Sequence, residues 1–334
     1  MRVIDQGGGA SFTAYRGDCV EIVRGIPDCS IDYSIFSPPF ASLYTYSASP
    51  RDLGNCKTHE EFAAHFRYLI PELFRVTKNG RLLSFHCMVL PTSKVRDGVI
   101  GLTDFRGNLI RDFTECGWIH HSEVVIWKDP VTAMQRTKAL GLLHKQIVKD
   151  SAMGRQGIPD YLITMRKPGV NEEPIPECFD RYFGEDPAPT DPYTTDFHTR
   201  NPYSIAVWQR YASPVWMDIK PSDTLQYRSA REHADERHIA PLQLTVIRRA
   251  VELWTNPGDV VLSPFSGIGS EGVVSLEMQR RFIGIELKKS YYEQGVRNLQ
   301  AAESQQGSMF PDSVRGYAGE IATDLVDDKD EGDD

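Results

Sequence analysis

Residues 258–286 read GDVVLSPFSGIGSEGVVSLEMQRRFIGIE and predict a strand, a glycine-rich turn, a helix and a second strand. The turn carries Gly267, Gly269 and Gly272, which have the G-x-G-x-x-G spacing in the strand–turn–helix context that it requires. Such glycines let the backbone approach an adenosine-containing cofactor closely. Glu286, at the end of the second strand, stands where a carboxylate accepts hydrogen bonds from ribose hydroxyls. The segment therefore predicts an α/β fold with a nucleotide-type cofactor site.

Another predicted strand ends in a proline turn. The apolar run Ile31–Phe36 predicts a buried strand, and Pro38 and Pro39 end it, because each proline fixes φ and lacks a backbone donor. The hydroxyl of Ser37 and the carbonyl of Pro38 are then expected to be unpaired acceptors beside the ring of Phe40, at the edge where open α/β sheets bind ligands. These groups suit a planar ligand with an exocyclic NH2, although a simple strand terminator with a core Phe has the same sequence.

Together these motifs resemble the DNA amino-methyltransferases, which methylate N4 of cytosine or N6 of adenine with S-adenosylmethionine. Ser37–Phe40 matches motif IV of that family, Ser263–Gly269 is similar to motif I, and Glu286 falls on the acidic residue of motif II. Four further segments resemble the family: motif X at His238–Leu244, motif VIII at Gly117–Lys128, the helix, turn and strand before it at Glu72–Leu83, and an upstream signature at Gly17–Cys19. The catalytic motif precedes the cofactor motif, which is the order of the permuted β group.

The resemblance implies a Rossmann-like methyltransferase fold, that is, a doubly wound and mostly parallel sheet with an inserted target-recognition region. It implies that catalysis depends on Ser37, Pro38, Pro39 and Phe40. It also implies that S-adenosylmethionine is bound by Asp18, Pro241, Gln243, Ser263, Phe265, Gly267, Gly269 and Glu286. The chain departs from the family at two points, since Ser263 replaces the usual Asp of motif I and the common Lys after Gln243 is missing.

Strand-like and helical patterns alternate on both sides of the middle of the chain, as a doubly wound sheet requires. Besides the segments above, the sequence predicts helices at 60–76, 109–116 and 246–254 and strands at 81–85, 120–127 and 160–166, the last two antiparallel. We expect four units: the first part of a catalytic domain (1–167), a target-recognition insertion (168–235), the second part with the cofactor motifs (236–300), and a mobile acidic tail (301–334).

Charge is distributed unevenly along the chain. The net charge is −9, but residues 128–167 carry eight Lys and Arg against three Asp. Most of these cations lie in a long basic excursion, residues 129–159, and local charge is what forms an electrostatic footprint on phosphates. The sequence therefore predicts double-stranded DNA as the partner, with a solvated basic face as the alternative. The predicted DNA contacts are Arg136, Lys138, Lys145 and Arg155.

Composition excludes several classes of protein. No segment approaches the roughly 18 apolar residues of a membrane span, and the first residues do not form a signal peptide. The six cysteines are scattered without a C-x-x-C, so we expect reduced thiols in a cytoplasmic protein, and neither a metal site nor a disulfide framework. A homodimer is compatible with the sequence, and a partner nuclease of a restriction–modification pair stays open.

The predicted chemistry is methyl transfer to an amine. An exocyclic amine is a poor nucleophile because its lone pair is delocalised into the ring, and acceptors for its two N–H groups favour a more tetrahedral nitrogen. Transfer then depends on positioning and electrostatics without a covalent enzyme intermediate, and the base must flip out of the duplex. Methylation of ring C5 would need a nucleophilic Cys directly after a Pro, a pair that this chain lacks.

Cytosine N4 is the expected target atom, because family members with Ser at the first position of motif IV mostly methylate cytosine and those with Asp or Asn mostly adenine. Adenine N6 is the main alternative. More distant alternatives are a methyltransferase acting on RNA or on a protein amide, a nicotinamide-dependent oxidoreductase, and a catalytically silent DNA-binding protein. The oxidoreductase leaves Ser37–Phe40 unexplained, and the silent protein is suggested by Ser263 alone.

Overall fold

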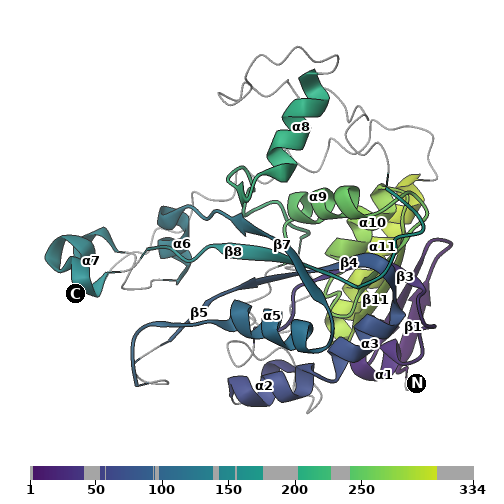
Figure 1. The fold of residues 1–334 in the computed structure, drawn as a ribbon, viewed down its shortest axis with the longest axis horizontal. Coiled ribbons are helices and arrows are strands. Elements are labelled where there is room, and N and C mark those ends of the chain that lie inside the picture. The colour runs from purple at the N-terminus through teal and green to yellow at the C-terminus, as the bar shows by residue number, and fades with distance from the viewer. Residues whose placement is uncertain are drawn as a thin grey trace, which may run out of the picture.

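A nine-stranded sheet forms the centre of the computed structural model, which describes residues 3–40, 53–56, 58–92, 94, 98–137, 143–154, 156–175, 202–226 and 241–306 (Figure 1). The strands lie in the order β1-β2-β11-β10-β3-β4-β8-β7-β9. Their bounds are β1 (Asp5–Gly8), β2 (Phe12–Arg16), β3 (Ile31–Phe36), β4 (Thr77–Met88), β7 (Ile119–Ile126), β8 (Asp160–Arg166), β9 (Val215–Trp216), β10 (Val260–Ser263) and β11 (Arg281–Glu286). A separate two-stranded sheet pairs β5 (Leu90–Pro91) with β6 (Leu102–Thr103).

The centre of the large sheet is parallel. Strands β2, β11, β10, β3 and β4 all run in one direction. Strand β8 is antiparallel to both β4 and β7, and β1 is antiparallel to β2. The mostly parallel α/β fold is therefore confirmed, as is the antiparallel pair at 120–127 and 160–166. This pair does not end the sheet, because β9 adds a parallel strand beyond β7.

Helices cover both faces of the sheet (Figure 1). One core packs α1, α2, α3 and α5 against the sheet, and a second core packs α9, α10 and α11 against the opposite face. Leu83 belongs to the first core and Leu82 to the second, as the alternation of side chains along a strand requires. The helix bounds are α1 (Cys19–Val23), α2 (His59–Phe66), α3 (Leu69–Val76), α5 (Phe105–Glu115), α6 (Pro130–Thr137), α7 (His144–Lys149), α8 (Pro202–Ala212), α9 (Leu244–Trp254), α10 (Ser270–Glu277) and α11 (Lys289–Gln306), with short 3₁₀ turns η2 (Leu53–Asn55) and η4 (Ser151–Met153).

The predicted helix at 60–76 is divided into α2 and α3. Pro71 lies in the first turn of α3, where a missing N–H is tolerated, but within one continuous helix its ring would clash with the carbonyl of Arg67. The chain therefore ends α2 at Phe66 and restarts at Leu69. Prediction from hydrophobic spacing alone joined the two because both present an apolar face to the same core.

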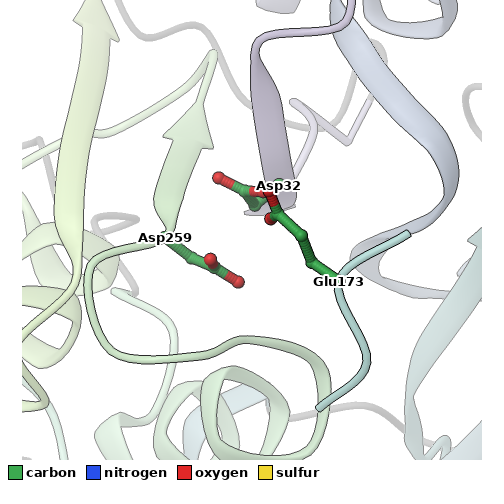
Figure 2. Close-up of side chains that lie close together, drawn as sticks. All are labelled: Asp32, Glu173 and Asp259. Atoms are coloured by element: carbon green, nitrogen blue, oxygen red, sulfur yellow. The ribbon is translucent and has the colours of Figure 1, made fainter. Parts of the chain in front are cut away.

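A cluster of charged side chains joins β3 and β10 at their amino ends. Arg81, which is 2% exposed, lies 3.1 Å from Asp32 and 3.0 Å from Asp259. Figure 2 shows Asp32 on a strand and Asp259 directly before the neighbouring strand, with Glu173 approaching them from a separate loop. Lys78 is 2.7 Å from Asp32 and 3.1 Å from Glu173. The three carboxylates are spaced closely enough to hold a metal ion, but Lys78 and Arg81 already form ion pairs with them, so we interpret the cluster as structural.

The basic excursion and the described end of the predicted insertion are attached to strands β7, β8 and β9. Helices α6 and α7 of the basic excursion extend beyond the ends of β7 and β8 (Figure 1). The described end of the predicted insertion contains α8 and β9, and β9 belongs to the central sheet. Most of the insertion and the acidic tail lie outside the described residues. None of the helices that the structure describes combines the length and the apolar character needed to cross a membrane.

Candidate functional site

The proline turn and the glycine turn meet at one edge of the sheet. Strands β3 and β10 pair in parallel, so Ser37–Phe40 and Pro264–Gly269 leave neighbouring strands at their carboxyl ends. The rings of Phe36 and Phe265 lie 5.8 Å apart between their centroids. The chain then continues from β3 to β4 on one side and from β10 to β11 on the other. This edge is therefore the topological switch point, where open α/β sheets bind ligands.

The glycine turn has the backbone that a close ligand needs. Gly267 and Gly269 have φ values of 51° and 88°, in the left-handed region that favours glycine. A Cβ on Gly267 would meet no described atom within 4 Å, so the backbone there borders open space. A Cβ on Gly272 would collide with Leu299 and Phe282. The third glycine thus allows α10 to pack closely against α11 and β11.

Glu286 holds the glycine turn from the end of β11. One carboxylate oxygen accepts a hydrogen bond from the Gly267 N–H at 2.9 Å, and the other accepts from the Lys288 N–H at 2.8 Å. A carboxylate has about four acceptor positions, so these two backbone N–H groups do not by themselves occupy all of them. Glu286 therefore lies where the sequence predicted it, beside the turn, and its contact with a ribose stays a prediction.

Asp18 reaches the same edge from β2. The Gly17 N–H donates to the Glu286 carbonyl at 3.0 Å, which fixes the turn after β2 beside the end of β11. The Asp18 carboxylate caps α1 by accepting from the N–H groups of Val20 and Glu21. Burial, with a contribution from the Asp18 carboxylate, raises the pKa of the adjacent Cys19 thiol. Cys19 is therefore held as a thiol, which suits a site without a cysteine nucleophile.

Motif X also lies at this edge. Helix α9 begins directly after motif X and runs back to the opposite end of β10, where that strand starts. Pro241 and Gln243 stand directly before α9, and Gln243 is its N-terminal flanking residue. The Oε1 atom of Gln243 is buried and lacks a hydrogen-bond partner in the described part of the chain. The same is true of the Ser263 hydroxyl at the end of β10, which is fully buried. Each atom therefore has hydrogen-bonding capacity that the described residues leave unused.

Glu271, which our sequence analysis did not single out, lies in the first turn of α10. Its side chain is only 4% exposed. Burial raises its pKa to about 8, and the charge of Glu286 adds to the effect. Glu271 is therefore mostly protonated at neutral pH. Glu271 lies inside the glycine motif, between Gly269 and Gly272, but the sequence could not show that its side chain is buried.

The hydroxyl of Ser37, which we expected to be unpaired, has a partner that sequence analysis missed. Its Oγ atom lies 3.1 Å from Nδ1 of His86. Strands β3 and β4 pair in parallel with Phe36 opposite Phe85, and Ser37 and His86 are the next residue of each strand. The predicted strand ended at Phe85, whereas β4 continues to Met88. One more residue of strand would have placed the histidine beside the serine.

The buried carboxylate of Asp160 lies beside His86. The Nε2 atom of His86 is 3.2 Å from Oδ2 of Asp160, and Oδ1 of Asp160 accepts from the Lys128 ammonium at 2.5 Å. Burial by itself would raise the pKa of Asp160, but His86 and Lys128 outweigh it and hold the pKa below its ordinary value. The ring of Phe40 lies 6.2 Å from that of His86. A chain of side chains therefore runs from the proline turn to Lys128.

Two of the four residues predicted to contact DNA lie within the described part of the chain. Lys145 is exposed on α7, and Arg136 belongs to α6. Lys138 and Arg155 lie outside the described residues. The excursion begins just after β7, whose carboxyl end is on the same edge as those of β3 and β10. Its cations are thus attached to the edge that carries the two turns. Lys128, directly before the excursion, instead pairs with Asp160.

Known proteins with similar sequences or folds include several DNA methyltransferases. DNA adenine methyltransferase YhdJ of Escherichia coli (strain K12) is 34% identical over 84 residues, which cover 25% of this chain and 29% of YhdJ. In four curated relatives the matching stretch spans 22–37% of the relative's length. TTHA0409 of Thermus thermophilus, in complex with S-adenosyl-L-methionine, superposes with a TM-score of 0.57 at 18% identity, covering 86% of this chain and 94% of that one.

The PvuII DNA methyltransferase, described as cytosine-N4-specific, superposes with a TM-score of 0.60 at 15% identity and covers 91% of this chain and 96% of that one. At such low identity these superpositions establish the fold alone. A family model described as DNA methylase, for N6 and N4 methyltransferases, matches residues 31–297. This match extends from β3 through the glycine turn into α11 and includes both halves of the site. The chain therefore belongs to the N6/N4 DNA methylase family.

Proposed function

We propose that this protein is an S-adenosylmethionine-dependent DNA methyltransferase that methylates an exocyclic amine, N4 of cytosine. The observation that carries the proposal is the juxtaposition of Ser37–Phe40 and Pro264–Gly269 on adjacent parallel strands. The proline turn offers hydrogen-bond acceptors and an aromatic ring, and the glycine turn offers backbone without side chains beside open space. A methyl donor and a planar amine would meet between them.

The residues at the glycine turn fit the cofactor. Gly267 leaves space over the turn, the Ser263 hydroxyl and the Gln243 amide oxygen lack partners among the described residues, and the Glu286 carboxylate lies directly beside the turn. These groups, with Phe265 against the Phe36 ring, would hold the adenosine and methionine parts. When bound, S-adenosylmethionine supplies an electrophilic methyl group on a sulfonium centre.

The proline turn would act on the target amine. The Pro38 carbonyl and the Ser37 hydroxyl accept its two N–H groups, so that the nitrogen becomes more tetrahedral and its lone pair is directed at the methyl group. The ring of Phe40, fixed against Phe105 and His86, provides the face on which the base stacks. A base reaches this pocket only when it has flipped out of the duplex.

DNA would approach along the side that carries the basic excursion. Arg136, Lys138, Lys145 and Arg155 are proposed to contact phosphates and thereby position the duplex, while base recognition would come from the insertion at residues 168–235. This division of roles agrees with the attachment of the excursion to the same sheet edge as the two turns. The acidic net charge does not oppose it, because local charge governs approach to phosphates.

The choice of cytosine rests on Ser37 as the first residue of the motif. Adenine N6 is the second candidate, favoured by the similarity to YhdJ, whose name specifies adenine. Both amines have the same two N–H donors, so the acceptors alone serve either base.

Mass spectrometry of nucleosides tests the proposal. DNA incubated with the purified protein and labelled S-adenosylmethionine should contain N4-methylcytosine. N6-methyladenine without N4-methylcytosine would overturn the choice of base, and label in neither nucleoside would overturn the DNA methyltransferase proposal. Label in RNA or protein instead would identify one of the alternative substrates.

A further inference from the structure

The pairing of Ser37 with His86 bears on how the serine hydroxyl can act. A hydroxyl can donate one hydrogen bond and accept two. To receive an N–H from the target amine it must present a lone pair, with its own hydrogen directed elsewhere. Nothing in a serine side chain enforces that orientation, because the hydroxyl rotates freely. The neighbour at 3.1 Å, Nδ1 of His86, is the group that can fix it.

The direction of that hydrogen bond depends on which ring nitrogen of His86 carries the proton. Nε2 is buried 3.2 Å from the Asp160 carboxylate, in a contact that is electrostatic and lacks the geometry of a hydrogen bond. A protonated Nε2 is attracted by this anion, whereas a bare nitrogen lone pair would be repelled. In the neutral ring, Nδ1 is then an acceptor and takes the hydrogen of the Ser37 hydroxyl. Both lone pairs of Ser37 Oγ are then left to accept hydrogen bonds.

Lys128 keeps Asp160 in the form that this arrangement needs. The Lys128 ammonium donates to Oδ1 of Asp160, while Oδ2 faces His86. His86 is 8% exposed and Asp160 is 4% exposed, so neither reaches the space above the proline turn and each acts through its neighbour. Phe40 packs against His86, which holds the ring in the orientation that presents Nδ1 to the serine.

We propose that His86, oriented by Asp160 and Lys128, is a positioning residue that holds the Ser37 hydroxyl as an obligate acceptor for the target amine. The inference rests on the proposed function, since the acceptor matters only for transfer to an N–H group. It assigns to His86, Asp160 and Lys128 an effect on the chemical step. It assigns them none on binding of S-adenosylmethionine, because Asp160 and Lys128 act through His86 and His86 contacts the proline turn.

A double-mutant cycle separates this role from a structural one. His86→Leu has a similar volume without an acceptor and should lower kcat about 10-fold, as loss of one oriented hydrogen bond predicts. In a Ser37→Ala background the same change should alter kcat by less than about 2-fold, since no hydroxyl remains to be oriented. His86→Asn should restore most of the rate, because its Oδ1 lies about where Nδ1 was and accepts a hydrogen bond.

Controls keep the outcomes distinct. Calorimetry should give unchanged affinity for S-adenosylmethionine in every His86 variant, and His120→Leu, on the exposed part of β7, should leave kcat unchanged. Equal losses from His86→Leu with and without the Ser37 hydroxyl would overturn the inference. If the wild-type protein transfers no methyl group to DNA, the proposed function fails instead.

A measurement that needs no activity completes the test. Nitrogen-15 NMR of the histidine side chains should show His86 as the Nε2–H tautomer at neutral to alkaline pH. Asp160→Asn, which exchanges the anion for an amide, should weaken that preference. An Nδ1–H tautomer in the wild-type protein would overturn the inference whatever the enzyme's activity proves to be.

Discussion

Phe36 and Phe265 lie with their ring centroids 5.8 Å apart, and this contact joins the two halves of the site. Phe36 is fully buried and directly precedes Ser37. Phe265 lies just before the glycine turn and packs also against Phe66 of α2 at 6.3 Å. The distance between the proline turn and the glycine turn is therefore set by the hydrophobic core, so single changes in either turn should alter one proposed function at a time.

Gly267→Ala should weaken binding of S-adenosylmethionine about 10-fold, because the new methyl group would project into the open space over the turn. Gly258→Ala is a matched control. Both glycines have a left-handed φ, of 51° and 87°, and a Cβ on either meets no described atom within 4 Å, so both variants should lose about 1–2 kcal/mol of stability. Gly258, however, lies at the opposite end of β10. Calorimetry that finds equal cofactor affinity in the two variants would contradict the assigned pocket.

Glu286→Ala should lower cofactor affinity by about 10- to 100-fold, the range for hydrogen bonds to a charged group. The variant removes both a predicted ribose acceptor and the acceptor of the Gly267 N–H. Glu277→Ala serves as the comparison, because Glu277 pairs with Arg248 on the outer side of α10 and should bind the cofactor normally. Undiminished affinity in Glu286→Ala, measured by calorimetry, would remove Glu286 from the site.

The order of strands and helices could be predicted from the sequence, because the spacing of apolar residues identifies most elements and Pro and Gly residues mark their ends. Elements without these signals were missed. Strand β1, whose sequence is DQGG, has no apolar residue and is defined only by its pairing with β2. Strand β9 has two residues and depends on β7. Such short edge strands form because a neighbouring strand offers free hydrogen-bonding groups, which a local pattern does not show.

The site was predictable in its motifs but not in its supporting contacts. Ser37–Phe40 and the glycine turn each have a local signature. By contrast, the pairing of Ser37 with His86 depends on the register of two strands, which a single sequence does not specify to one residue. Lys128 was similarly assigned to the basic surface, although it pairs with Asp160. Long-range partners of charged residues follow from tertiary packing.

Arg81→Met should destabilise the protein by about 3–5 kcal/mol, because it leaves buried carboxylates without their shared cation. Arg81 is 2% exposed and pairs with both Asp32 and Asp259. Lys78→Met is the control, since its side chain is 33% exposed, and a smaller loss is expected. Denaturant unfolding at neutral pH measures both. If Arg81→Met is as stable as the wild-type protein, the cluster does not join β3 to β10 in the way we describe.

Neutralising the basic excursion should flatten the salt dependence of DNA binding. In a variant with Arg136, Lys138, Lys145 and Arg155 changed to Gln, the slope of log affinity against log salt should fall by about 0.9 for each lost phosphate contact. Arg111→Gln, an exposed change on α5, should leave the slope unchanged. Titrations at several salt concentrations test this, and an unchanged slope in the quadruple variant would place the DNA elsewhere.

Glu271 should make stability depend on pH. Its pKa is about 8 in the folded protein against an ordinary value of 4.5, so between these values the folded state binds more protons than the unfolded state. The free energy of unfolding should then decrease as the pH rises from 4.5 to about 8 and level off above. Glu271→Gln should remove this decrease and be more stable than the wild-type protein at pH 8, by an amount on the order of 2–5 kcal/mol.

Denaturant unfolding without cofactor, at several pH values between 5 and 8.5, measures the difference between the two proteins, from which other titrating groups cancel. Glu277→Gln is the control on the same helix, because its side chain is 30% exposed and paired with Arg248, and its difference from the wild-type protein should vary little with pH. The difference in free energy of unfolding between Glu271→Gln and the wild-type protein must grow with pH, because only ionisation of the buried carboxyl opposes folding. A constant difference across the range would mean that Glu271 ionises in the folded protein as it does in water.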